Sequence, residues 1–182
     1  HLPEALYNIE QWMRQQENAA TKITEQILQV NSFSHFLAVI FGIGILTGIG
    51  EEMIFRGVLQ RIVQDKNHRA HVAVWICAFL FSAIHLQFYG FIPRLLLGAF
   101  FGYLLIWSKN LWLPIFAHLF NNSTVACISY FTNDKSPDNL IETVGTSGSP
   151  TSWLAGASLI GTVILLYVLY KKVFVSKSKE FF

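Results

Sequence analysis

Residues Gly48–Gly57 read GIGEEMIFRG and place three charged side chains, Glu51, Glu52 and Arg56, within a markedly apolar sequence. The preceding stretch, Gln26–Gly50, contains no Asp, Glu, Lys or Arg. An ionisable residue at membrane depth costs at least about 2.5 kcal/mol, so such residues usually face the interior of a helical bundle and carry function. The decapeptide therefore decides how the fold is interpreted and where a site is expected.

The composition favours a membrane protein. Of the 182 residues, 53% are hydrophobic and 13% are charged, whereas a soluble domain carries roughly 25% charged residues. A formal net charge of +2, without a basic stripe interleaved with aromatic residues, gives no indication of nucleic-acid binding. Cys77 and Cys127 lie in separate apolar stretches without metal-ligand spacing, which predicts two free thiols.

Stretches without Asp, Glu, Lys or Arg divide the chain into candidate membrane segments. A crossing helix needs about 20 mostly apolar residues, and all but the third stretch reach this length. The third is short enough for a tilted or partial span. The stretches are Gln26–Gly50, Val72–Pro93, Leu95–Ser108, Asn110–Asn133 and Thr143–Tyr170. The predicted fold is all-α, a polytopic transmembrane helical bundle with about five membrane-embedded segments.

Four regions are expected along the chain. Residues 1–30 show helical apolar spacing between polar residues, which predicts an amphipathic interfacial helix. Residues 31–131 form the membrane core, 132–151 an exposed polar loop, and 152–182 a last transmembrane helix with a basic tail. The chain begins at His1, so a fragment or processed form that lacks earlier spans is compatible with this pattern.

Charge placement predicts an orientation. With five crossings, the basic residues of the connections and of the C-terminal tail all fall on one face, which the positive-inside rule makes cytoplasmic. These residues are Arg61, Lys66, Arg69, Lys109, Lys171, Lys172, Lys177 and Lys179. We therefore expect a multi-pass integral membrane protein of a bacterial-type inner membrane, with its C-terminus in the cytoplasm.

Helical spacing separates the two adjacent glutamates. Glu52 and Arg56 are four residues apart, so they share a face and can pair within one helix. Glu51 lies about 100° around the helix axis from Glu52, because a helix has 3.6 residues per turn. One carboxylate thus has a partner within its helix, and the other faces something else.

Histidines with the same four-residue spacing occur on two further segments. Phe81 precedes His85, and His118 precedes Asn122, so three helices each offer a polar face toward a common point. A carboxylate removed from water suits a general base, imidazoles can orient water or bind a metal, and an amide can stabilise an oxyanion. The chain contains no G-x-S-x-G or HExxH motif. The residues alone leave three functions open: a hydrolytic site, helix contacts that are purely structural, and a proton or ion pathway.

Three motifs resemble those of a known family. EEMIFR (Glu51–Arg56) is similar to the EExxxR motif of the CAAX-protease and bacteriocin-processing intramembrane proteases, also called the abortive-infection family. FSAIH (Phe81–His85) resembles its FxxxH motif, and HLFNN (His118–Asn122) its HxxxN motif. Each motif alone is weak, whereas all three in order on separate predicted spans are specific.

The resemblance implies an intramembrane endopeptidase that hydrolyses a membrane-associated or lipidated peptide. By position, Glu51 resembles the general base and His85 its partner in activating water. His118 and Asn122 resemble the residues that hold the oxyanion. The residues that would position the first helix or the substrate, or pack the site, are Glu52, Arg56 and Phe81.

A metal and a non-catalytic function both remain as alternatives. In a metalloendopeptidase reading, a divalent ion such as zinc would be held by Glu51, His85 and His118, and the preferred reading is a metal-free, glutamate-activated water. The competing function is a non-proteolytic membrane immunity or scaffold protein whose buried polar contacts are structural. Lipid and a membrane peptide are the expected partners, and the GxxxG motif of Gly98 and Gly102 does not decide the oligomeric state.

Overall fold

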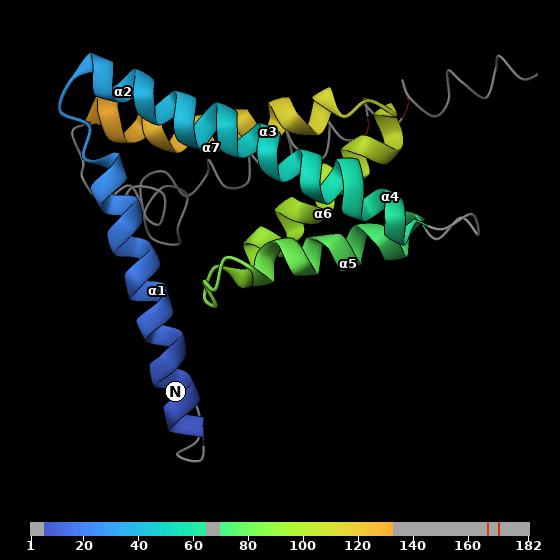
Figure 1. Cartoon of the computed structure of the whole chain (residues 1–182), viewed down its shortest axis with the longest axis horizontal. Helices are drawn as coiled ribbons and strands as arrows, with labels where there is room; N and C mark the ends of the chain where they lie inside the picture. The colour runs from blue at the N-terminus through green and yellow to red at the C-terminus, as the bar shows by residue number, and fades with distance from the viewer. Residues whose placement is uncertain (1–5, 65–69, 133–166, 168–170, 172–182) are drawn as a thin grey trace, which may run out of the picture. The chain divides into compact units, whose positions relative to one another are not determined.

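The computed structural model describes residues 6–64, 70–132, 167 and 171, and within them every regular element is helical (Figure 1). The chain divides into two units, residues 1–131 and 132–182. The first unit contains the three motifs. The predicted exposed loop (132–151) and C-terminal transmembrane helix (152–182) lie outside the described residues, apart from Thr132, Tyr167 and Lys171.

One long helix carries the decapeptide. Its consecutive segments join into an uninterrupted helix of 31 residues, Phe33–Val63. The segments are α2 (Phe33–Val39), η2 (Ile40–Leu46), α3 (Thr47–Glu52), η3 (Met53–Leu59) and α4 (Gln60–Val63), of which η2 and η3 are π-helical. π-Helical turns widen a helix and frequently occur at functional sites. Here they flank α3, which ends on the two glutamates.

The predicted bounds of this first span were wrong at both ends. The chain leaves helix α1 (Tyr7–Leu28) after Leu28, and the Ser32 hydroxyl accepts a hydrogen bond from the His35 N–H to start α2. A Ser at this position is a favourable N-cap, so the apolar stretch contains a helix boundary. At the other end, the charges after Gly50 do not end the helix, because they lie on its inner side.

The second predicted span is also corrected. Helix α5 (Ala70–Ala83) has 14 residues and stops well before Pro93, and α6 (Phe91–Ser108) begins earlier than expected. Between them the chain turns at Leu86, whose φ is 54°. Pro93 lies in the first turn of α6, where a missing N–H is tolerated, so the proline follows a helix start instead of ending a span.

Helices α5 and α6 form an antiparallel pair. Ala78 lies opposite Gly98, Val74 lies opposite Gly102, and the Ser82 hydroxyl donates to the Phe91 carbonyl at 2.8 Å. A Cβ on Gly98 would lie 3.2 Å from the Ala78 Cα, so the glycine allows the two backbones to approach. The GxxxG motif thus serves packing within the unit.

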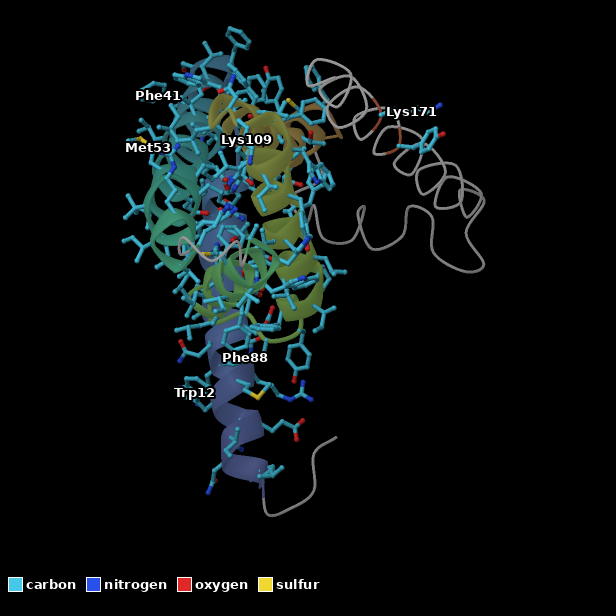
Figure 2. The ribbon with its side chains drawn as sticks, turned by 90° about the vertical axis from the view of Figure 1, so that its right-hand side faces the viewer. Trp12, Phe41, Met53, Phe88, Lys109 and Lys171 are labelled. Carbon is cyan, nitrogen blue, oxygen red and sulfur yellow. The ribbon has the colours of Figure 1, made fainter. Side chains whose placement is uncertain are left out.

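Helix α7 (Trp112–Thr132) runs antiparallel to the long helix, as Figure 1 shows for α7 alongside α2 and α3. The ring of Phe36 stacks on Tyr130 with centroids 4.6 Å apart, and Gly48 meets the Leu119 backbone further along. Helix α1 contacts the α5–α6 turn: Trp12 lies against Phe88 at 5.1 Å (Figure 2).

Two helices in the described part are long and apolar enough to cross a membrane, Phe33–Val63 and Phe91–Ser108. Phe41 and Met53 project outward from the first of them (Figure 2), and each is about half exposed, as expected of side chains that face lipid. The prediction of about five embedded segments is not confirmed. Residues 7–28 are helical as expected, and their interfacial placement stays a prediction.

Candidate active site

Two of the three charges in the decapeptide form a buried ion pair. The Arg56 Nη1 donates to Glu52 Oε1 at 2.9 Å, and both side chains are fully buried. This confirms the pairing predicted from the four-residue spacing. A buried ion pair is stable only where further hydrogen bonds offset the loss of water.

Helix α6 and three aromatic rings supply these further contacts to Arg56. Its Nη2 donates to the Gly98 carbonyl at 2.7 Å, which links the long helix to α6. The guanidinium carbon lies 4.9–5.8 Å from the centroids of three phenylalanine rings, within the range of cation–π attraction. The rings belong to Phe55, Phe81 and Phe101.

His118 completes the buried network from α7. Its Nδ1 lies 2.9 Å from the same Glu52 Oε1 that Arg56 contacts, and its ring stacks on Phe101 with centroids 4.9 Å apart. An ionised carboxylate only accepts, so the Nδ1 carries the hydrogen and Nε2 of the neutral ring keeps a lone pair. Glu52 therefore fixes both the orientation and the tautomer of His118.

The backbone fixes His85 in the same way. Its Nδ1 lies 2.7 Å from the Phe81 carbonyl oxygen, one helical turn earlier. Because a carbonyl only accepts, this nitrogen donates, and Nε2 of the neutral ring is again the lone-pair atom. The four-residue spacing thus lets the Phe81 carbonyl orient the His85 ring, in addition to placing the two side chains on one face.

Glu51 faces both imidazoles. Its Oε1 lies 4.0 Å from His85 Nε2, and its Oε2 lies 3.7 Å from His118 Nε2. The Oε2 is buried and makes no hydrogen bond to any described residue. Glu51 and His85 remain about a quarter exposed, whereas His118 is nearly fully buried. Glu51 is too far from either imidazole for a direct hydrogen bond. A water molecule about 2.8 Å from Glu51 and from one Nε2 atom can bridge the two, because water has two O–H donors.

The same distances argue against a tetrahedral zinc ion among these side chains. Two ligands at about 2.0–2.1 Å from zinc lie roughly 3.3 Å from each other, closer than either N–O separation of Glu51. In the described residues, no group of three or more His, Cys, Asp or Glu side chains is arranged to hold a metal ion. The residues do not fit a tetrahedral zinc ion in this geometry.

The remaining predicted residues differ in their distance from this centre. Phe81 packs edge-on against His85, with ring centroids 5.0 Å apart, and also contacts His118. Asn122 lies one turn beyond His118, and its Nδ2 donates to the Ile43 carbonyl at 3.2 Å. No side-chain hydrogen bond joins Asn122 to Glu51, His85 or His118 in the part of the chain that the structure describes.

Sequence reasoning missed Gln60 and Phe101. Gln60 is fully buried, and its Nε2 donates to the Gly102 carbonyl at 3.2 Å, parallel to the bond from Arg56 to Gly98. Its position four residues after Arg56, on the same face as Glu52, was a usable signal. Phe101 carried no such signal, because one phenylalanine among sixteen is not marked by spacing.

A comparison with known protein families gives a match over the region that contains the candidate site residues. A family model described as type II CAAX prenyl endopeptidase Rce1-like matches residues 33–124, just over half of the chain. The chain belongs to this family. All three motifs fall within the matched range, which confirms the resemblance that they indicated. Members of the Rce1-like family are membrane proteins and are usually peptidases.

A curated relative extends the comparison without adding an activity. The Bacillus subtilis (strain 168) protein named "Uncharacterized protein YpbD" is 29% identical over 109 residues, which cover 58% of this chain and 51% of that protein. The chain thus spans about half the length of the relative. No solved structure matches this chain significantly.

Proposed function

We propose that this Rce1-like chain is an intramembrane endopeptidase in which Glu51 activates a water molecule. The observation that carries the proposal is the division between the two glutamates. Glu52 is used by Arg56 and His118, whereas Glu51 has an unpaired Oε2, and its two oxygens each face one imidazole nitrogen. A carboxylate with free lone pairs beside two further acceptors is suited to bind and deprotonate water.

The reaction follows from these atoms. Water that donates one hydrogen bond to Glu51 and the other to Nε2 of His85 gives one proton to Glu51, and its oxygen attacks the carbonyl carbon of the substrate peptide bond. The tetrahedral intermediate carries an oxyanion. Collapse of the intermediate breaks the C–N bond, and the carboxylic acid of Glu51 returns its proton to the leaving amine. The products are a carboxylate and an amine.

The neighbouring residues would position these groups. Glu52 and Arg56 hold His118 and the long helix, and Phe81 packs under both histidines. We assign oxyanion stabilisation to the amide hydrogen of Asn122 that does not bond to Ile43, and to His118 when its ring is charged. Donors that are already oriented stabilise an oxyanion at little reorganisation cost.

The substrate would reach the site within the membrane. Glu51 lies ten residues before Arg61, about 15 Å along the helix from the basic end. A peptide that is itself membrane-associated or lipidated would therefore be favoured. Arg61 and Lys109 on one end of the unit support the expected orientation with this end in the cytoplasm of a bacterial-type inner membrane.

Replacement of Glu51 by Gln tests the proposal. Native protein and the Glu51→Gln variant are reconstituted with membrane extracts and with a farnesylated CaaX peptide, and new peptide termini are identified by mass spectrometry. A general base contributes about 10²–10⁴-fold, so termini formed by the native protein should fall by at least about 100-fold in the variant. Equal cleavage by both proteins, with both folded, contradicts the proposed role of Glu51.

A specific observation also favours the non-proteolytic alternative. The hydrogen bonds of Glu52, Arg56 and His118 join the long helix, α6 and α7, and would do so in a scaffold or immunity protein as well. That function does not require the unpaired oxygen of Glu51. Under it, Glu51→Gln leaves the biological effect of the protein intact, and no cleavage product depends on this residue.

A further inference from the structure

A cavity lies at the C-terminal end of the long helix and is separate from the candidate active site. Its volume is about 150 Å³, and it is formed where α4 and α6 end. Two basic, one polar and two apolar side chains line it: Arg61, Gln64, Leu105, Ile106 and Lys109. None of these residues contributes to the constellation around Glu51.

The cavity lies at the level where both candidate membrane spans finish. The bonds from Arg56 to Gly98 and from Gln60 to Gly102 advance together along both helices, so α6 runs parallel to the long helix. Phe33–Val63 and Phe91–Ser108 therefore end on one side. Tyr103 stacks on Trp107 near this end at 5.5 Å, and such aromatic side chains are enriched at the membrane interface.

The cavity is lined by two basic side chains without a described acidic partner and by two apolar side chains. Arg61 and Lys109 are exposed, and neither makes an ion pair with any described residue. No Asp or Glu is among the five described side chains that line the cavity. Leu105, which is buried, and Ile106, which is half-buried, line the same cavity as the two cations. A ligand with an anionic group next to hydrocarbon matches this arrangement.

We propose that the cavity binds the phosphate of an anionic phospholipid headgroup. Arg61 and Lys109 bind the phosphate oxygens from two helices, Gln64 donates from its amide, and the first carbons of the lipid lie on Leu105 and Ile106. Basic pockets between the ends of transmembrane helices recognise anionic headgroups through the same chemistry. A soluble phosphate compound offers the same oxygens without the hydrocarbon, and the experiment must separate the two.

Thermal unfolding of the detergent-solubilised chain measures this binding without any cleavage assay. A ligand that binds the folded state raises its unfolding temperature. Phosphatidylglycerol should raise the temperature of the native protein, whereas phosphatidylcholine and glycerol phosphate at equal concentration should not. In Arg61→Gln or Lys109→Asn, we expect about fivefold more phosphatidylglycerol for the same shift, since each cation at an anionic membrane surface contributes about this factor. Asn tolerates the left-handed conformation of Lys109, whose φ is 57°.

The matched control is Lys22→Gln, which removes one exposed charge from α1 far from the cavity in sequence. It should leave the response unchanged. An equal shift with phosphatidylcholine, or an equal response of native protein and the double variant Arg61→Gln/Lys109→Asn, overturns the proposal. If glycerol phosphate at equal concentration raises the unfolding temperature of the native protein, the ligand is a soluble phosphate compound and not a lipid. This result also overturns the proposal. Cations at helix ends that only balance the helix dipole would change stability and not the lipid response.

Discussion

Two glutamate–arginine pairs in this chain have the same order and the same four-residue spacing, and only one of them belongs to the candidate site. On α1, Arg14 donates to Glu10 at 2.6 Å, and the Arg14 side chain is 51% exposed while that of Glu10 is 12% exposed. On the long helix, Arg56 donates to Glu52 at 2.9 Å, and both side chains are fully buried. The local pattern is thus identical, and the two arginines differ in exposure: Arg14 is half exposed and Arg56 is fully buried.

The difference shows that partners from other helices, rather than the pair itself, give the second pair its role. The Glu52 oxygen that binds Arg56 also binds His118, and Arg56 reaches the Gly98 carbonyl. An exposed pair is solvated and contributes little, whereas a buried pair depends on every contact around it. Changes to Arg56 and its surroundings should therefore have effects that changes on α1 do not.

The largest effect is expected for Arg56→Met. Methionine has a similar length without the charge, so Glu52 is left buried with only His118 as a partner. Removal of one member of a buried ion pair costs about 3–5 kcal/mol, and the free energy of unfolding in detergent should fall by this amount. The matched control is Arg14→Met, which removes the same charge from a half-exposed arginine and should lower the free energy of unfolding by less than about 1 kcal/mol. Equal losses from both variants would show that burial does not distinguish the pairs.

A smaller loss in the free energy of unfolding is expected for Gly98→Ala, which changes the residue whose carbonyl accepts a hydrogen bond from Arg56. The added Cβ would lie 3.1 Å from a Phe81 ring carbon and 3.2 Å from the Ala78 backbone, and overpacking of this kind costs about 1–3 kcal/mol. Gly42→Ala is the control, because nothing lies within 4 Å of its added Cβ. Chemical denaturation of both variants tests the contrast. A tolerated Gly98→Ala would mean that α5 and α6 separate easily.

The smallest effect is expected for Gln60→Leu, one turn beyond Arg56. Gln60 has one hydrogen bond, to Gly102, and its buried Oε1 has no partner among the described residues. An apolar side chain of similar size removes the bond and the unpaired oxygen together, so the free energy of unfolding should change by less than about 1 kcal/mol. A loss close to that of Arg56→Met would place Gln60 in the charged network and would contradict this ranking.

The sequence predicted the components of the site better than its helix bounds. Spacing alone gave the Glu52–Arg56 pair and the separation of Glu51, because both depend only on the helical period. The bounds failed at Pro93, where a proline that fits the first turn of α6 resembles one that ends a span. They failed again at Gly50, since a charge that has a buried partner does not stop a helix.

The long-range contacts could not be predicted from spacing. His118 lies 66 residues from Glu52, and nothing in either motif tells that its Nδ1 binds this carboxylate and not Glu51. The positions of Phe101 and Gly98 beside Arg56 depend on how α6 packs against the long helix. Asn122 shares a helix face with His118, and its observed contact is nevertheless the Ile43 carbonyl.

The division between Glu51 and Glu52 is tested most directly by the unfolding free energies of Glu51→Gln and Glu52→Gln, measured side by side in one detergent. Gln at position 51 loses no hydrogen bond to a described residue and relieves an unpaired buried oxygen, so its stability should stay within about 1 kcal/mol of the native protein. Gln at position 52 weakens the contacts to Arg56 and His118 and should lose about 2–4 kcal/mol. Equal losses in the two variants, or a larger loss for Glu51→Gln, would contradict the account.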